Sequence, residues 1–235
     1  MFRLGDLISH LDMSREEGRH LQQGMNFRVR PGHSVVLMSR RPDAPYADAV
    51  EDDGTIVYEG HDAPKSKGIP NPKAVDQPDR SSKGRLLQNG LFEQAAIAFQ
   101  EGEREAERVR VYEKVFDGVW TYNGLFALTR ADRVPAGERI VFKFRLEPLA
   151  ELSADLAAST HPERSLQLVH ARPIPTAVKR AVWQRDNGRC VRCGRTDNLH
   201  FDHILPYSKG GASITVDNVQ ILCAEHNLAK GARIE

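Results

Sequence analysis

The C-terminal stretch LHFDHILPYSKGGASITVDNVQILCAEHNLAKG, residues 199–231, decides the fold of the last quarter of the chain. Near its end, Cys223 and His226 stand three positions apart. Thirty residues before Cys223, in RCVRCG, Cys190 and Cys193 form a second pair at the same spacing. Two thiolates of a Cys-x-x-Cys turn can reach one Zn²⁺, and a second pair completes a tetrahedron. The two pairs therefore predict a Cys₃His zinc site.

Two other interpretations of these residues are open. The cysteines can be small buried apolar residues, although their ligand spacing and polar surroundings argue against that. Alternatively, His226 faces a catalytic metal and the zinc lacks its fourth protein ligand. Neighbouring helix positions project about 100° apart, so only one of His226 and Asn227 can continue the face of Cys223. This favours His226 as the zinc ligand.

Composition limits the possible classes of protein. The chain has 235 residues, long enough to bury a core, and a net charge of +1, so DNA binding requires a local basic patch. No apolar run approaches the ~20 residues of a membrane span, and the N-terminus lacks a signal-peptide core. We therefore expect a cytoplasmic protein, and in that reducing compartment clustered cysteines indicate metal rather than disulfides.

The segments between and after the two ligand pairs resemble the HNH nuclease family, which has the ββα-metal fold. The resemblance covers roughly residues 176–234 and rests on Asp202-His203-Ile204, KGG, DNVQILC and NLAKG. It implies that His203 activates water and that Asn218 orients the histidine-bearing hairpin. It also implies that Asp202 and Asn227 hold a catalytic Mg²⁺ or Mn²⁺, hard ions that suit oxygen ligands. Asn227 stands where the family usually has histidine, so the motif is of a His-Asn-Asn kind.

Several basic residues of this region are candidate phosphate contacts. For each of them, a solvated surface charge is the more common role. The C-terminal candidates are Arg189, Arg192 and Lys230.

The first 148 residues resemble SRA domains, which flip 5-methylcytosine or a related base out of DNA. The blocks EDDG, VYEG, VDQ, FDGVW and FKFRL follow the order of the SRA blocks. The resemblance implies a pocket in which Asp53 accepts a hydrogen bond from the cytosine amino group and Tyr58 stacks on the base. The family's second stacking tyrosine falls at Val50, so Tyr46 is the substitute. On the residues alone, a hairpin turn for EDDG and a core position for Tyr58 are the favoured interpretation, and the order of the blocks shifts the preference to the base pocket.

The long segment 61–85 is rich in Pro, Lys, Ser and Gly, and a loop of this length is uncommon without a function. We expect Lys65, Lys67 and Lys73 in it to bind DNA. The region after it predicts a helix over residues 91–109 and then strands with alternating apolar residues. Pro175 and Thr176 open a further helix with Val178, Val182 and Trp183 on its apolar face.

The predicted fold class is α+β. An SRA-like (PUA-like) twisted β-barrel domain spans residues 1–149, a helical linker 150–174, and a zinc-stabilised ββα-metal HNH domain 175–235. The leading hypothesis is a modification-dependent restriction endonuclease that flips and reads 5-methylcytosine or 5-hydroxymethylcytosine in double-stranded DNA. The alternatives are an HNH endonuclease directed by sequence or structure, and a non-catalytic reader of modified DNA. Because an HNH site cuts one strand at a time, a double-strand break needs two protomers or two nicks, which makes a homodimer a reasonable expectation.

Overall fold

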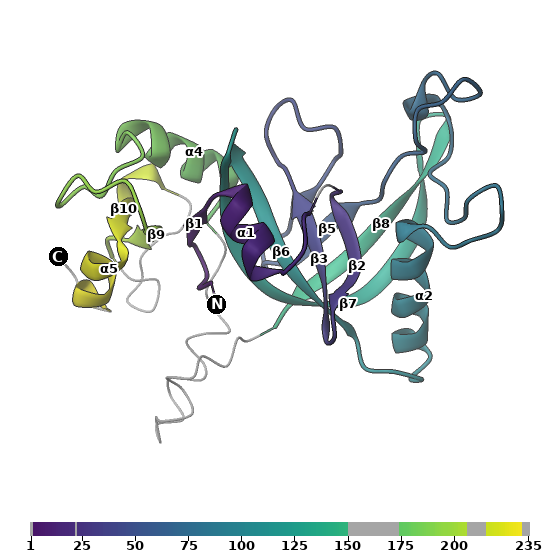
Figure 1. Ribbon diagram of the computed structural model, residues 1–235, viewed down its shortest axis with the longest axis horizontal. Helices are drawn as coiled ribbons and strands as arrows, with labels where there is room; N and C mark the ends of the chain where they lie inside the picture. Colours follow the sequence, from purple (N-terminus) through teal and green to yellow (C-terminus); the bar gives the residue numbers. More distant parts are fainter. Residues whose placement is uncertain (1, 22, 150–173, 206–214, 232–235) are drawn as a thin grey trace. The chain divides into compact units, whose positions relative to one another are not determined.

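The computed structural model describes residues 2–21, 23–149, 174–205 and 215–231 (Figure 1). The chain divides into two compact units. One unit combines Met1–Gly18, Tyr112–Gly124 and Leu149–Glu235, and the other combines Arg19–Val111 and Leu125–Pro148. The predicted linker lies outside the described residues except for its last position, Ile174. This grouping differs from the predicted boundaries, because it joins two N-terminal segments to the nuclease region.

The main sheet has eight strands, which confirms the predicted α+β class. Its order is β2-β3-β6-β7-β8-β5-β4, and β1 pairs antiparallel with β7. The strands are β1 (Leu7–Ile8), β2 (Met25–Arg30), β3 (His33–Met38), β4 (Ala49–Val50), β5 (Ile56–Glu59), β6 (Glu107–Phe116), β7 (Val119–Ala136) and β8 (Arg139–Pro148). Asp117 and Gly118 connect β6 to β7, and the φ of +77° at Gly118 explains why glycine occupies this tight turn.

Helix α2 (Gln88–Gln100) packs Phe92 and Ala96 into the core of the second unit. That core also holds apolar side chains from both ends of the sheet, including Tyr58 of β5 and Phe144 of β8. The helix is shorter than the predicted 91–109, because Gly102 takes a φ of +72° and ends it. Residues from Glu107 onward pair as β6 instead, so the last three positions assigned to the helix belong to a strand.

The nuclease region is a small ββα arrangement preceded by a helix. Its elements are α4 (Thr176–Arg185), β9 (Leu199–His203), the 3₁₀ helix η3 (Val216–Asn218), β10 (Val219–Cys223) and α5 (Ala224–Lys230). Strands β9 and β10 pair antiparallel (Figure 1). Val178 and Val182 of α4 are buried in its core and Trp183 is partly buried, as the apolar face of the sequence predicted.

Two short helical segments complete the described structure, one in each unit. Helix α1 (His10–Glu16) begins at Ser9, whose hydroxyl accepts a hydrogen bond from the Asp12 N–H. The 3₁₀ helix η1 (Pro72–Ala74) lies in the long loop 61–85. Among the described residues, no helix is long and apolar enough to cross a membrane.

Candidate active site and metal centre

The predicted zinc ligands converge. The ligand atoms of Cys190, Cys193, Cys223 and His226 all lie within 4.8 Å of one another. His226 Nδ1 is 3.4 Å from Cys190 Sγ and 3.3 Å from Cys223 Sγ, and the Sγ atoms of Cys193 and Cys223 are 3.8 Å apart. A tetrahedron with Zn–S bonds of about 2.3 Å has edges of about 3.8 Å. The four side chains therefore fit one tetrahedral Zn²⁺.

The electrostatics of Cys190 suit a metal ligand. Burial of its thiol opposes ionisation, but hydrogen bonds from the backbone around Cys223, Cys193 and Arg192 outweigh that effect. Together with His226 they lower the pKa of Cys190 to about 6. A thiolate, rather than a thiol, is the form that binds metal.

Asn218 fixes the start of the segment that follows β9. Its side-chain oxygen accepts a hydrogen bond from the Leu205 N–H at 2.8 Å, and its amide nitrogen donates to the Leu205 carbonyl at 3.1 Å. The Ile204 N–H donates to the Asn218 carbonyl at 2.9 Å. Asn218 thus forms three hydrogen bonds to the backbone of the two residues that follow His203. These contacts are compatible with the orienting role that the resemblance implied for Asn218, which stays a prediction.

His203 is the last residue of β9 and pairs with Val219 of β10. Its Nε2 atom is buried and has no hydrogen-bond partner among the described residues. Burial lowers the pKa of His203, the charge of Asp202 acts against that shift, and Lys230 adds to it. The imidazole is therefore held in its neutral form, with one nitrogen unused.

Asp202 and Lys230 form a buried ion pair beside this histidine. Lys230 Nζ lies 2.9 Å from Asp202 Oδ2 and donates to the His203 carbonyl at 2.7 Å. The Lys230 side chain is 0% exposed and that of Asp202 is 14% exposed. A phosphate contact, as the sequence suggested for Lys230, is not available in this conformation, because the ammonium does not reach solvent.

The remaining predicted residues of this region lie at its surface or edge. Asn227 is half-buried on α5, one residue after the zinc ligand His226, and Arg189 and Arg192 are exposed. His200 does not join the site, since its Nδ1 lies 2.5 Å from Oδ1 of Asp6.

The predicted base-pocket residues do not converge in the same way. Tyr58 is 1% exposed and belongs to the core of the second unit. Asp53 is exposed, accepts a hydrogen bond from the Thr55 N–H at 2.9 Å and lies 3.9 Å from Arg145. A base can stack on Tyr58 only after side chains around it move.

Tyr46 takes part in a stack that the sequence did not reveal. Its ring lies 5.7 Å from that of His61 at an interplanar angle of 22°, and Lys73 Nζ is 4.3 Å from its centroid. Lys73 also pairs with Asp62 at 2.9 Å, whereas Lys65 and Lys67 are exposed. Lys73 is thus committed to its own loop, and Lys65 and Lys67 are available to a ligand.

Asp48 and His61 are further polar residues of this neighbourhood that sequence patterns missed. Burial raises the pKa of Asp48 to about 6 and lowers that of His61 to about 4. Asp48 accepts hydrogen bonds from the backbone of Ser39 and Glu59. We call Tyr46, Asp48, Tyr58 and His61 the reader cluster. No motif spacing marks it, because its members come from separate loops and a strand.

Gly24 allows two of these side chains to meet. A Cβ atom at Gly24 would lie 2.7 Å from Tyr58 Oη and 2.7 Å from His61 Nε2. Both polar ends therefore approach the backbone of residue 24 closely, and an alanine there would displace them.

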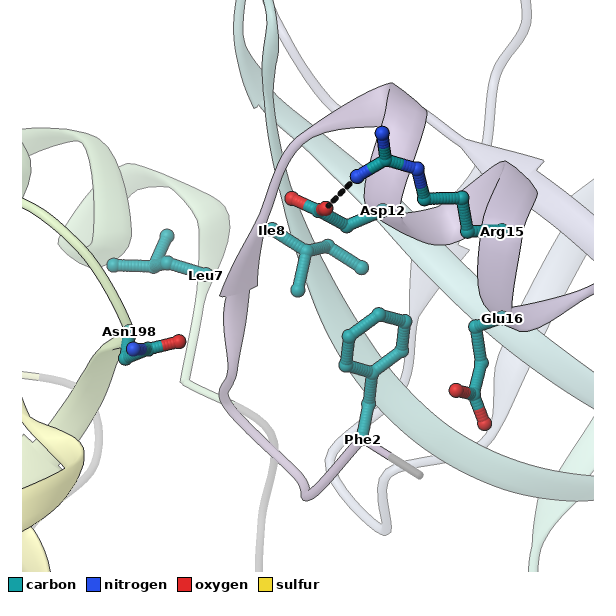
Figure 2. A pocket seen from close by; sticks show the side chains of 7 residues that line it. All are labelled: Phe2, Leu7, Ile8, Asp12, Arg15, Glu16 and Asn198. Atoms are coloured by element: carbon teal, nitrogen blue, oxygen red, sulfur yellow. Dashed lines mark ion pairs between the residues drawn. The ribbon is translucent and has the colours of Figure 1, made fainter.

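A surface depression of about 430 Å³ lies beside α1 (Figure 2). Figure 2 shows Leu7 and Ile8 of β1 pointing to opposite sides of the strand, and Arg15 pairing with Asp12 at 3.7 Å. Two of its charged groups, Asp12 and Arg15, pair with each other, and we assign no function to the depression. It is lined by Phe2, Leu7, Ile8, Asp12, Arg15, Glu16 and Asn198.

Residues 190–233 match the family model of the HNH endonuclease. The C-terminal region is therefore an HNH endonuclease domain, as its resemblance predicted. No curated protein matches the chain.

Two solved structures illustrate what the chain is similar to. The SUVH5 SRA domain in complex with methylated CHH DNA is 15% identical with a TM-score of 0.42, and the match covers 63% of this chain and 85% of that one. The phosphorothioation-dependent type IV restriction endonuclease ScoMcrA is 17% identical with a TM-score of 0.42, covering 99% of this chain and 56% of that one.

Proposed function

We propose that this chain is a metal-dependent DNA endonuclease directed to modified cytosine. In this proposal His203 is the general base, Asp202 and Asn227 hold the catalytic divalent ion, and Cys190, Cys193, Cys223 and His226 hold a structural Zn²⁺. The N-terminal region reads 5-methylcytosine or 5-hydroxymethylcytosine in double-stranded DNA.

The observation that carries the nuclease part is the state of His203. Its Nε2 is buried without a partner beside a carboxylate, and burial keeps the ring neutral. A neutral imidazole with a free nitrogen can take a proton from a water molecule that attacks phosphorus. Because Nε2 is buried, we expect the side chains around it to shift and admit that water when DNA binds. Because Asn218 holds the adjoining backbone through Leu205, the ring keeps its direction while the proton moves.

Asp202 and Asn227 offer the hard oxygen ligands that Mg²⁺ and Mn²⁺ prefer. A bound divalent ion neutralises the phosphate and stabilises the charge that develops on the leaving 3′-oxygen. Asp202 contributes its charge next to His203, and Asn227 adds a neutral carbonyl oxygen from the facing helix. The zinc ligands tie α5, which carries Asn227, to the turn at Cys190.

The reader part rests on the order of the SRA-like blocks and on the aromatic groups of the reader cluster. We propose that Asp53 accepts a hydrogen bond from the cytosine amino group and that Tyr46 stacks on the flipped base. Tyr58 forms the floor of the pocket once its neighbours open. Exposed Lys65 and Lys67, with Arg189 and Arg192 of the nuclease, contact phosphates.

The test uses one DNA fragment in two forms, with cytosine unmodified or 5-methylated, incubated with the protein and Mn²⁺ or Mg²⁺. We expect cleavage of the methylated form only. His203→Ala should lower the rate by about 100-fold to 10,000-fold, the usual contribution of a general base. His20→Ala, which changes an exposed histidine, is the matched control and should leave the rate unchanged.

Each part of the proposal can fail separately. Equal cleavage of both forms would remove the modified-base reader and keep the nuclease. Cleavage that survives His203→Ala unchanged would remove His203 as the base. Loss of binding to methylated DNA in Tyr46→Ala, with unmodified DNA as reference, would support the pocket.

A further inference from the structure

Lys230 is a buried cation placed inside the proposed catalytic site. Its side chain is 0% exposed, and its ammonium contacts Asp202 Oδ2 at 2.9 Å and the His203 carbonyl at 2.7 Å. An ammonium is costly to bury unless it is paired and hydrogen-bonded, and here it is both. Through these contacts the last residue of α5 is fastened to the end of β9.

Both side chains that bond to the Asp202 carboxylate contact the same oxygen atom, Oδ2. Gln220, its cross-strand partner in β10, donates from Nε2 to the same Oδ2 atom at 3.3 Å. None of the described residues donates to Oδ1. Lys230 and Gln220 therefore hold one oxygen of the carboxylate and leave the other to a ligand.

The charges of this site cancel. Among the described residues that we assign to the site, Asp202 is the single carboxylate, Lys230 carries one positive charge, and His203 and Asn227 are neutral. A divalent cation that approaches Asp202 Oδ1 meets the buried ammonium across the same carboxylate, and the repulsion between the two positive charges opposes its binding. The protein alone thus supplies no net negative charge for a dication, whereas a DNA phosphate would supply one.

We infer that the positive charge of Lys230 weakens binding of the catalytic cation in the absence of DNA, so that the cation binds tightly only when DNA is bound. This inference rests on the proposed role of Asp202 as a metal ligand. Without DNA, Lys230 neutralises Asp202 and keeps α5 attached to β9. With DNA, the phosphate restores the negative charge that Lys230 has cancelled, so cation and DNA bind cooperatively. Lys230 acts through Asp202 and is a positioning residue.

The test measures Mn²⁺ affinity by calorimetry on the full chain, with its zinc retained and without DNA. Lys230→Met keeps the length of the side chain and removes its charge, and we expect it to bind Mn²⁺ about tenfold more tightly than the wild type. Lys230→Arg keeps the charge and should bind like the wild type. Equal or weaker binding by Lys230→Met would overturn the inference.

A second variant and a second ligand keep the test decisive. If Lys230→Met does not fold, as judged by circular dichroism, Lys230→Gln is the neutral variant that retains a donor. In a His203→Ala background, which prevents cleavage, duplex DNA should tighten Mn²⁺ binding more when Lys230 is present than in Lys230→Met. An equal effect of DNA in both would overturn the inference.

Asp202→Asn separates this inference from the proposed function. If Asp202→Asn binds Mn²⁺ as tightly as the wild type, Asp202 is not a ligand, and the proposed site and the inference fall together. If Asp202→Asn weakens binding but Lys230→Met does not strengthen it, the inference alone falls.

Discussion

The nuclease site and the reader cluster both contain side chains whose pKa values are shifted by burial. They differ in whether the polar atoms of the described residues already have hydrogen-bond partners. In the nuclease site, His203 Nε2 and Asp202 Oδ1 have no partner among the described residues. In the reader cluster, Asp48 is bonded to the backbone of Ser39 and Glu59, and Tyr46 is stacked on His61.

The difference shows how each site is held. The nuclease groups are fixed by their surroundings: Asn218 holds the backbone, Lys230 holds Asp202, and the cysteines and His226 hold the helix. In the reader cluster, backbone groups hold Asp48, and Tyr46 and His61 stack on each other, so a base would have to displace some of these contacts. We therefore expect the nuclease groups to keep their backbone positions when DNA binds and the reader cluster to rearrange.

The largest expected effect is loss of the zinc site, which tests whether the nuclease region depends on its metal. Cys190→Ser removes one of four ligands, and structural zinc sites contribute on the order of 10 kcal/mol to folding. We expect zinc content to fall and the nuclease region to lose its cooperative melting. Val191→Ser, at an exposed neighbouring position, is the control. A Cys190→Ser protein that melts like the wild type would show that the cysteines are merely buried apolar residues.

The next effect concerns the buried ion pair that joins α4 to β6. Lys179 Nζ lies 2.7 Å from Glu113 Oε2 and donates to Asn123 Oδ1 at 2.8 Å, while the Thr176 hydroxyl donates to Glu113 Oε1. Burial opposes ionisation of Glu113, but the charge and hydrogen bond of Lys179 dominate and lower its pKa. Glu113→Gln leaves a buried ammonium without a counter-charge and should destabilise the fold by about 3–5 kcal/mol.

The double variant Glu113→Gln/Lys179→Met should cost less than the sum of the single changes, because it leaves no unpaired charge. Urea unfolding measures all three. Lys114→Met breaks the neighbouring exposed pair with Asp117 and should cost no more than about 1 kcal/mol. Additive single effects would mean that the pair is not coupled.

The cysteine–histidine cluster was predictable because metal chemistry constrains it locally: the spacing of the cysteines with His226 follows from ligand reach. Asp202 and His203 were assigned through the resemblance to the HNH family, and their roles stay predictions. Lys230 illustrates what spacing does not show: as a lysine near the C-terminus of a helix it is typical of a surface charge. Only the pairing of α5 with β9 reveals that it is buried against Asp202.

The reader cluster was less predictable because its residues meet through long-range packing. Tyr46 and His61 are fifteen positions apart on two loops, and Asn89 of α2 holds the His61 backbone through bonds of 2.8 Å. Helix α2 was expected, but its end was not, since Gly102 outweighs the helix propensity of the charged residues after it. Likewise, nothing in the sequence indicated that β6 and β7 reach the nuclease helix.

A smaller effect is the pH dependence of stability in the reader cluster. The pKa of Asp48 is raised to about 6, so its contribution to stability is present below about pH 4 and is lost as pH rises through 6. The pKa of His61 is lowered to about 4, so its contribution is present above about pH 6.5 and is lost as pH falls through 4. The two slopes oppose each other in the same pH window.

Replacing one of these two residues should therefore reveal the pH dependence of stability that the other one causes. Relative to the wild type, Asp48→Asn should gain about 2–3 kcal/mol of unfolding free energy between pH 4 and 6.5, and His61→Gln should lose a similar amount. Urea unfolding at several pH values measures this, with exposed Asp43→Asn as the control. Slopes unchanged in both variants would show that neither residue is held in its buried protonation state.

We expect Asp53→Asn to have the smallest effect on folding. It tests directly whether the reader region binds a flipped cytosine. Asp53 is exposed and contacts the Thr55 N–H and, at 3.9 Å, the Arg145 side chain, so the melting temperature should not change. If Asp53 accepts the amino group of the flipped cytosine, replacing one acceptor oxygen with a donor should weaken binding of methylated DNA by roughly tenfold. The neighbouring exposed Asp52→Asn controls for loss of negative charge near the DNA. An unchanged affinity of Asp53→Asn for methylated DNA would leave Asp48, the buried carboxylate of the reader cluster, as the acid that meets the base, and would mean that the cluster must open before it reads DNA.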